Sequence, residues 1–151
     1  MAVSIAVESV ESMTRDDIAG LLAQHNAAVA SLPDKQVLAP DVAMYAQCEQ
    51  AGTFFVIVAR DNGEPVGYAG TFISRHRFYA GMVFANNDML FVSPKYRGTT
   101  LAFRLMRATV AEAKRRGATL MGWAAKPGSR LEHMLRRLGH TVEESLYLVE
   151  I

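Results

Sequence analysis

The chain has 151 residues, enough for one domain with a proper core, and half of them are hydrophobic, which excludes a disordered chain. Its formal net charge of +1 gives no general attraction to nucleic acid or to an anionic membrane. The single cysteine excludes an intrachain disulfide, and with four scattered histidines it leaves no zinc-type spacing, so we expect no metal. The first residues lack a basic start and carry Glu8 inside their apolar run, so we expect neither a signal peptide nor a membrane span, and a cytoplasmic location.

Residues 3–52 are predicted to form a strand, a helix, a loop and a second helix. Thr14 stands three residues before Asp17, a pattern close to a capping box, and it predicts the start of the first helix. On the apolar face of that helix, His25 is interpreted as a packed or hydrogen-bonded residue rather than a ligand. Pro33 and Pro40 break the chain between the two helices. The expected bounds are Val3 to Val7 for the strand, Thr14 to Val29 for the first helix, Ser31 to Pro40 for the loop and Asp41 to Gln50 for the second helix.

Residues 53–92 are predicted to form three antiparallel strands in a meander. The run from Thr53 to Ala59 is rich in β-branched and aromatic residues. Asn62 and Gly63 then supply the dipeptide that is typical of a tight hairpin turn. The two further strands are expected at Pro65 to Ser74 and at Met82 to Val92.

Residues 100–151 are predicted to form two helices and two strands. Apolar residues recur at helical spacing up to Gly117, a typical helix stop. The strand after that helix must run parallel to the strand ending at Val92, because a helix joins them. Ser129 and Glu132 form a capping box for the last helix. The expected bounds are Thr100 to Gly117 and Ser129 to Leu138 for the helices, and Ala118 to Trp123 and Thr141 to Ile151 for the strands.

The start of the first of these helices has an unusual charge. Helix N-termini carry partial positive charge and usually attract acids, but its first turns hold none. Lys95, Arg97, Arg104 and Arg107 add positive charge there instead. A buried strand, a turn at Gly98 and a basic helix start suit a phosphate, which binds free backbone N–H groups and cations. A solvated basic helix face is the alternative interpretation.

The stretch VSPKYRGTTLA resembles the acyl-coenzyme A loop of the GNAT superfamily of N-acetyltransferases. The family pattern is Arg or Gln, two residues, Gly, one residue, then Gly or Ala. Arg97 and Ala102 match this pattern, whereas Thr100 replaces the central Gly. The ending Arg137-Leu138-Gly139-His140 is similar to the Leu-Gly-Phe that follows the last helix in that family.

The resemblance implies an α/β (α+β) fold and one acetyltransferase domain over residues 1–151. The implied sheet is mixed and mostly antiparallel, is flanked by helices, and contains a splayed parallel pair of strands. The implied co-substrate is acetyl-CoA, with its pantetheine arm along the strand before the loop, its pyrophosphate on the loop N–H groups, and Lys95 and Arg104 as candidates to neutralise phosphate charge. The implied coenzyme-binding residues are Leu90, Phe91, Val92, Lys95, Arg97, Gly98, Thr99, Thr100, Leu101, Ala102 and Arg104.

The implied reaction is direct transfer of an acetyl group to a primary amine of a small molecule, a protein lysine or an N-terminus. The amine must be neutral to attack, so a base is useful. Asp88 lies roughly where the family often carries an acid, and a strand-edge Asp bonded to a turn is the alternative interpretation. A backbone N–H near Leu90 or Phe91 can polarise the thioester carbonyl.

Leu135 stands where many members of the family carry the Tyr that protonates the leaving thiolate. A Leu has no proton to give, and the nearest candidates by sequence are His133 and Tyr147. His133 is expected on a different face of the helix from Leu135, and strand alternation can turn Tyr147 either way. We therefore expect water to protonate the thiolate.

The acceptor is expected to enter between the loop at 31–40 and the turn at 75–81. The candidate residues for its site are His25, Arg75, His76 and Arg77. The last three favour an anionic acceptor or, alternatively, form a solvated hairpin tip. The implied partners are acetyl-CoA and the amine, without nucleic acid or membrane, and the oligomeric state stays open to a homodimer.

Two functions of other classes remain alternatives. A coenzyme A-binding module without catalysis is favoured by Thr100, because its branched side chain stands where the pyrophosphate approaches the backbone. A phosphate- or nucleic-acid-binding protein would use Arg104, Arg107, Arg115 and Arg116. The small net charge and the lack of an aromatic platform beside these arginines argue against the second alternative.

Overall fold

The computed structural model describes residues 2–32 and 34–151, so Pro33, predicted as a chain breaker, lies outside the described residues. Its strands are β1 (Val3–Glu8), β2 (Phe54–Asp61), β3 (Glu64–Arg75), β4 (Val83–Val92) and β5 (Leu120–Trp123). They form one sheet in the order β1-β2-β3-β4-β5, antiparallel throughout except for the parallel pair β4 and β5. The predicted mixed, mostly antiparallel sheet is therefore confirmed.

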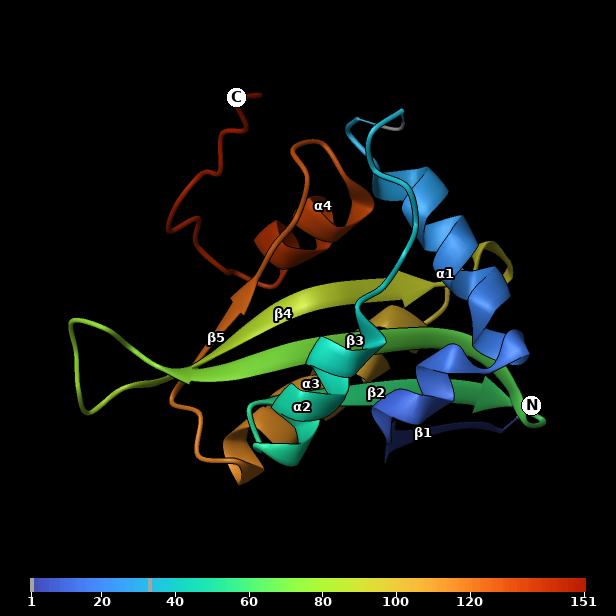
Figure 1. The fold of residues 1–151 in the computed structure, drawn as a ribbon, viewed down its shortest axis with the longest axis horizontal. Coiled ribbons are helices and arrows are strands. Elements are labelled where there is room, and N and C mark those ends of the chain that lie inside the picture. The colour runs from blue at the N-terminus through green and yellow to red at the C-terminus, as the bar shows by residue number, and fades with distance from the viewer. Residues whose placement is uncertain (1, 33) are drawn as a thin grey trace.

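Helices cover both faces of this sheet. The helices are α1 (Asp16–Val29), α2 (Val42–Gln50), α3 (Leu101–Arg115) and α4 (Arg130–Arg137), with short 3₁₀ turns η1 (Val10–Thr14) and η2 (Pro94–Tyr96). Figure 1 shows α1 and α2 in front of the sheet, α3 behind it, and α4 beyond the end of β5. The sheet is thus the middle layer of three.

The core follows from the alternation of side chains along β2. Phe54, Val56 and Val58 pack toward α1, whereas Phe55 and Ile57 pack toward α3. Successive residues of a strand point to opposite faces, and here both faces are covered. This explains why β2 is an unbroken apolar run from Phe54 to Ala59 rather than an alternating one.

The local turn signals in the sequence are confirmed. Asn62 and Gly63 both have positive φ, of 51° and 88°, as a tight turn between β2 and β3 requires. Ser129 Oγ accepts a hydrogen bond from the N–H of Glu132, so it caps α4 as predicted.

The predicted cap at Thr14 is wrong. Helix α1 begins at Asp16, and its N-cap residue is Arg15. The Thr14 hydroxyl instead donates to Glu11 O at 2.7 Å and closes the η1 turn. A Thr hydroxyl can donate to a nearby carbonyl as readily as it can accept from the N–H groups at the start of a helix. Here it makes the bond to the carbonyl within the local turn.

The predicted last strand, Thr141 to Ile151, is also wrong. All of these residues are described, and none of them is in a strand; most of their side chains are exposed. The apolar residues Leu146, Tyr147, Leu148 and Val149 are consecutive, so they give no single face to bury against a sheet. β-propensity alone does not place such a segment, because packing against neighbours decides it.

A substitution at Gly67 tests how closely β3 packs between β4 and α3. A Cβ at Gly67 would lie 2.9 Å from Phe91 O and 3.0 Å from Leu105 Cδ1, and a backbone oxygen cannot yield as a flexible side chain can. We expect Gly67→Ala to lower the free energy of unfolding by about 1–3 kcal/mol in urea denaturation.

The matched control is Gly81→Ala. A Cβ at Gly81 meets nothing within 4 Å, so the free energy of unfolding should change by less than about 0.5 kcal/mol. Equal effects of the two substitutions would contradict the close packing at Gly67.

Candidate active site

Strand β4 contains a bulge at Asp88. Gly70 pairs with Met89 and the next residue of β3, Thr71, pairs with Asn87, which leaves Asp88 as the extra residue. The buried Asn87 amide donates to Gly70 O at 3.1 Å and to Met89 O at 2.9 Å. These two hydrogen bonds hold the bulge, which re-aims the Asp88 side chain and bends the strand.

Strands β4 and β5 separate at the same point. Their pairing runs from Phe84 opposite Leu120 to Asn87 opposite Trp123, and in the described chain it extends no further. The backbone of β4 from residue 88 to residue 92 therefore has an open side facing away from β3. This is the predicted splayed parallel pair.

The backbone groups of Leu90 and Val92 face the open side of β4. Ser93 N–H donates to Val66 O across the ladder with β3, and alternate residues of a strand point their backbone groups to opposite sides. Val92 O accordingly accepts a hydrogen bond from Arg97 Nε at 3.2 Å, from outside the ladder. Leu90 and Val92 thus offer backbone groups to an extended ligand.

The loop before α3 presents free backbone donors. Gly98 has a φ of 85°, and Thr100, the N-cap residue of α3, makes no side-chain cap. Among the described residues, nothing accepts from the N–H groups of Ala102 and Phe103, in the first turn of the helix. Unpaired N–H groups and the helix dipole together favour an anion at this end.

The predicted coenzyme-loop cations lie in different places. The Arg97 guanidinium is 5.3 Å from the centre of the Phe91 ring and lies along the open side of β4. Lys95 Nζ lies over the Tyr96 ring. Arg104 Nη2 donates to Val3 O at 2.8 Å, so this side chain is tied to β1. The structure therefore brings Arg97, but not Arg104, to the open edge of β4.

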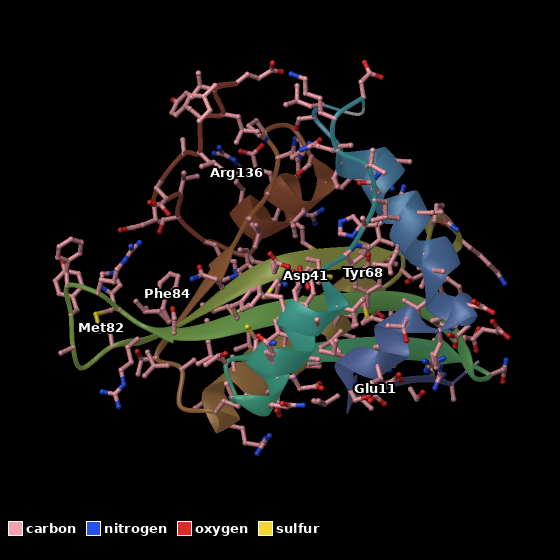
Figure 2. The ribbon with its side chains drawn as sticks, in the orientation of Figure 1. Glu11, Asp41, Tyr68, Met82, Phe84 and Arg136 are labelled. Carbon is pink, nitrogen blue, oxygen red and sulfur yellow. The ribbon has the colours of Figure 1, made fainter. Side chains whose placement is uncertain are left out.

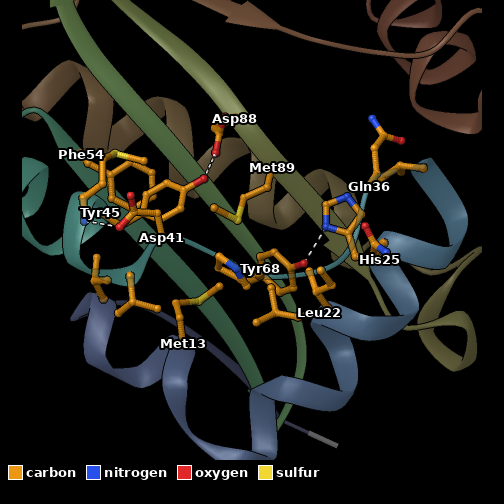
Figure 3. A pocket seen from close by; sticks show the side chains of 18 of the residues that line it. Met13, Leu22, His25, Gln36, Asp41, Tyr45, Phe54, Tyr68, Asp88 and Met89 are labelled. Carbon is orange, nitrogen blue, oxygen red and sulfur yellow. Dashed lines mark hydrogen bonds between the residues drawn. The ribbon is translucent and has the colours of Figure 1, made fainter. Parts of the chain in front are cut away.

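A pocket of about 520 Å³ opens beside Asp88, on the sheet face covered by α1 and α2. Its walls come from both helices, the loop between them, and strands β2 to β4 (Figure 3). Most of the walls are apolar, and they include Val10, Met13, Leu22, Val42, Phe54 and Met89. This volume and this mostly apolar lining are typical of a site for a small molecule.

Two hydrogen-bonded pairs supply most of the polarity of this pocket. Tyr45 OH donates to Asp88 Oδ2 at 2.6 Å, and His25 Nδ1 lies 2.6 Å from Tyr68 OH (Figure 3). His25 also stacks on Phe91, with 5.0 Å between ring centres. The structure thus brings the predicted residues Asp88 and His25 into one pocket, and His25 is packed and hydrogen-bonded as interpreted.

Sequence reasoning missed Tyr45 and Tyr68. Each lies in a segment without other chemical signals, and its partner is 43 residues away in the chain. A tyrosine in a strand or helix usually contributes area to a core, so only the tertiary contact reveals the pairing.

Burial shifts the pKa values of two side chains in this pocket, His25 and Tyr45. It lowers the pKa of His25 below its usual 6.5, and the nearby negative charge of Asp88 opposes this shift. His25 is therefore neutral at pH 7. Burial, together with the hydrogen bond to Asp88, raises the pKa of Tyr45, so Tyr45 stays a phenol and a donor.

The other predicted acceptor residues lie away from the pocket. Arg75, His76 and Arg77 are at the end of the β3–β4 hairpin, where His76 N–H donates to Met82 O at 2.9 Å. Figure 2 shows Met82 at the far end of this hairpin, well separated from Tyr68. None of the three lines the pocket.

The side chains considered as general acid also lie outside the pocket that contains Asp88. Tyr147 is 88% exposed in the C-terminal segment, and His133 Nδ1 lies 2.8 Å from Ser129 O in α4. Leu135 is buried. None of these side chains lines the pocket.

Within residues 2–32 and 34–151, no helix is long and apolar enough to cross a bilayer. No group of three or more His, Cys, Asp or Glu side chains in them gathers as a metal site would require.

The model of the acetyltransferase (GNAT) family matches residues 24–140, more than half of the chain. Curated proteins contain no match.

Solved structures share the fold over nearly the whole chain. An aminoglycoside acetyltransferase from an uncultured soil metagenomic sample has a TM-score of 0.78 at 17% identity, over 100% of this chain and 99% of its own. A ribosomal-protein-alanine N-acetyltransferase from Brucella melitensis biovar Abortus 2308 has a TM-score of 0.73 at 19% identity, over 99% of each chain. AAC(6')-Iy, in complex with the bisubstrate analog CoA-S-monomethyl-acetylneamine, has a TM-score of 0.72 at 21% identity, over 100% of this chain and 99% of its own.

The pKa of His25 tests whether Asp88 and His25 share one electrostatic environment. The Asp88 carboxylate favours the charged imidazolium, so Asp88→Asn should lower the pKa of His25 further below 6.5. The measurement is an NMR titration of the imidazole C–H signals. An unchanged or higher pKa of His25 would refute the shared environment.

Proposed function

Because the chain belongs to the GNAT acetyltransferase family, we propose that it is an N-acetyltransferase that moves an acetyl group from acetyl-CoA directly to a primary amine. The observation that carries this proposal is the arrangement around β4. Its open edge at Leu90 and Val92 lies between a loop with free N–H groups and the pocket at Asp88. One strand thus borders both a phosphate-binding loop and a small-molecule pocket.

The residues present fit coenzyme A. The N–H groups of Ala102 and Phe103 would hold the pyrophosphate, and Gly98 lets the loop turn toward it. The backbone groups of Leu90 and Val92 would pair with the pantetheine amides, once Arg97 releases Val92 O. The bound group would supply an acetyl thioester, whose carbonyl carbon is open to attack by an amine.

Asp88 is the proposed general base. An ammonium cannot attack, so the acceptor must lose a proton, and Asp88 is the carboxylate of the pocket nearest in sequence to the free edge. The bound ammonium gives one proton to Asp88, directly or through water, and the neutral amine then attacks the carbonyl carbon. As the C–N bond forms and the C–S bond breaks, the nitrogen's second proton passes to water, and the leaving thiolate takes a proton from water. The Leu90 N–H would polarise the carbonyl oxygen. Tyr45 holds the Asp88 carboxylate through its 2.6 Å hydrogen bond, so it is a positioning residue.

The contacts of the basic residues argue against a nucleic-acid-binding function. Arg104 donates to Val3 O, and Arg115 and Arg116 both form ion pairs with Glu112 at 2.7 Å. Three of the four arginines considered for that function are therefore engaged with the protein itself. A binding surface for phosphates would need them free.

Replacing Asp88 tests the proposed mechanism. We expect Asp88→Asn to lower the rate of acetyl transfer by about 10²–10⁴-fold, because it removes the general base. Release of free thiol from acetyl-CoA, with a panel of amines, measures this rate. Coenzyme A affinity, measured by calorimetry, should stay unchanged.

The control for that experiment is Asp16→Asn, which removes an exposed carboxylate on α1 outside the pocket. It should keep the full rate. Coenzyme A binding by the wild type without transfer to any amine would instead identify a binding module without catalysis.

Replacing Tyr147 and His133 tests the proposal that water protonates the leaving thiolate. Tyr147→Phe and His133→Ala should each keep the maximal rate within about tenfold, because the loss of a general acid costs more, about 10²–10⁴-fold. A hundredfold drop for either variant, with coenzyme binding intact, would identify that side chain as the acid.

A further inference from the structure

We propose that the acceptor is a small primary amine with one positive charge and an apolar body, bound in the pocket between α1, α2 and the sheet. This inference rests on the proposed acetyltransferase function and names the class of substrate for the same site. It excludes polyamines, aminoglycosides and anionic amines as preferred acceptors.

The walls of the pocket select for an apolar body. Figure 3 shows Asp88 at one end of the pocket, with Leu22 and Met13 at the other and Met89 between them. An amine held at Asp88 would lay the rest of its structure along these side chains. Burying apolar surface there is favourable, whereas burying hydroxyl groups without partners is costly.

Four polar side chains of the pocket are paired with one another. Tyr45 donates to Asp88, and Tyr68 pairs with His25. Asn26 and Gln36 are the uncharged polar side chains that remain in the lining, and Gln36 Oε1 already accepts from the N–H of Leu32. A sugar-like acceptor carries many hydroxyl and amino groups, and two amide side chains are too few to pair with them.

The charges of the pocket match a single ammonium. Among the described lining residues there is no Lys, Arg or Glu, and the acids are Asp41 and Asp88. Asp41 Oδ1 accepts from the N–H of Met44 at 2.9 Å and caps α2, so the helix start already compensates its charge. His25 is neutral. Asp88 is therefore the lining carboxylate left to pair with a substrate cation.

A second ammonium would lack a partner in this pocket. The cost of a desolvated, unpaired charge is several kcal/mol, which disfavours spermidine and aminoglycosides. An anionic group on the acceptor would also lack a partner, because Arg75, His76 and Arg77 do not line the pocket. A single apolar monoamine satisfies Asp88 and leaves no buried charge.

The test compares acceptors of different charge with the wild-type enzyme and acetyl-CoA. The panel is butylamine, hexylamine, 2-phenylethylamine, spermidine, neamine and a peptide that starts with alanine. We expect the apolar monoamines to have the highest kcat/KM, at least tenfold above spermidine and neamine. Between butylamine and hexylamine, kcat/KM should rise about fourfold per methylene, from ~0.8 kcal/mol per buried CH₂.

A charge variant makes the test specific to this pocket. Asn26 lines the pocket on α1, and Asn26→Asp adds a second carboxylate with almost no change in shape. It should raise kcat/KM for 1,6-diaminohexane relative to hexylamine by about tenfold, the value of one charged hydrogen bond. The matched control, Gln24→Glu, changes an exposed residue of the same helix outside the pocket and should leave the ratio unchanged.

The outcomes separate this inference from the function on which it rests. Higher kcat/KM for spermidine, neamine or the peptide than for the monoamines would overturn the inference and leave the acetyltransferase in place. No transfer to any amine, with 2-phenylethylamine still bound beside coenzyme A in calorimetry, would support the pocket assignment and overturn the acetyltransferase. Neither transfer nor binding would overturn both.

Discussion

The buried amide of Asn87 is the interaction on which the rest of the site depends. It bonds the carbonyls of Gly70 and Met89, which are on two neighbouring strands, and so holds one extra residue in β4. A buried carbonyl left without a donor costs about 1–3 kcal/mol, so the bulge is well determined. Pairing with β5 ends at this same residue. The bulge and the separation of the strands are therefore one feature, and they create both the open edge and the position of Asp88.

The two sides of the proposed reaction meet because one strand serves both. The side chain of Asp88 lines the pocket under α1 and α2, while the backbone two residues later faces the gap toward β5. The loop before α3 then adds free N–H groups at the end of the same strand. A backbone site accepts an extended ligand with little regard to side chains, which explains how Thr100 can replace a glycine without removing the donors. We therefore expect the side chains of the pocket, rather than those of the loop, to determine which acceptor binds.

Features with a local cause were predictable from the sequence. Asn62 and Gly63 define their turn by backbone preference, and Ser129 caps α4 through a side chain three residues from its donor. The charge pattern of α3 and the family resemblance led to the correct fold and to Asp88 and Arg97, which lie at the open edge or in the pocket.

Features with a long-range cause were not predictable. The Tyr45–Asp88 pair joins residues 43 apart, and the C-terminal segment has strand-like composition but no face to pack. Arg75 to Arg77 look like part of a site in sequence and lie at a hairpin end in space.

A titration of the ¹⁵N-labelled protein with coenzyme A, followed through its backbone amide signals, tests whether the open edge of β4 is the coenzyme site. The largest shifts should lie at the N–H groups of Leu90 and Val92 and at residues 98–103, because these groups would contact the pantetheine arm and the pyrophosphate. Signals of Arg115 and Arg116, on the far end of α3, should scarcely move. Largest shifts at that end of α3, or no shifts at millimolar coenzyme A, would contradict the assignment of the open edge of β4 as the coenzyme site.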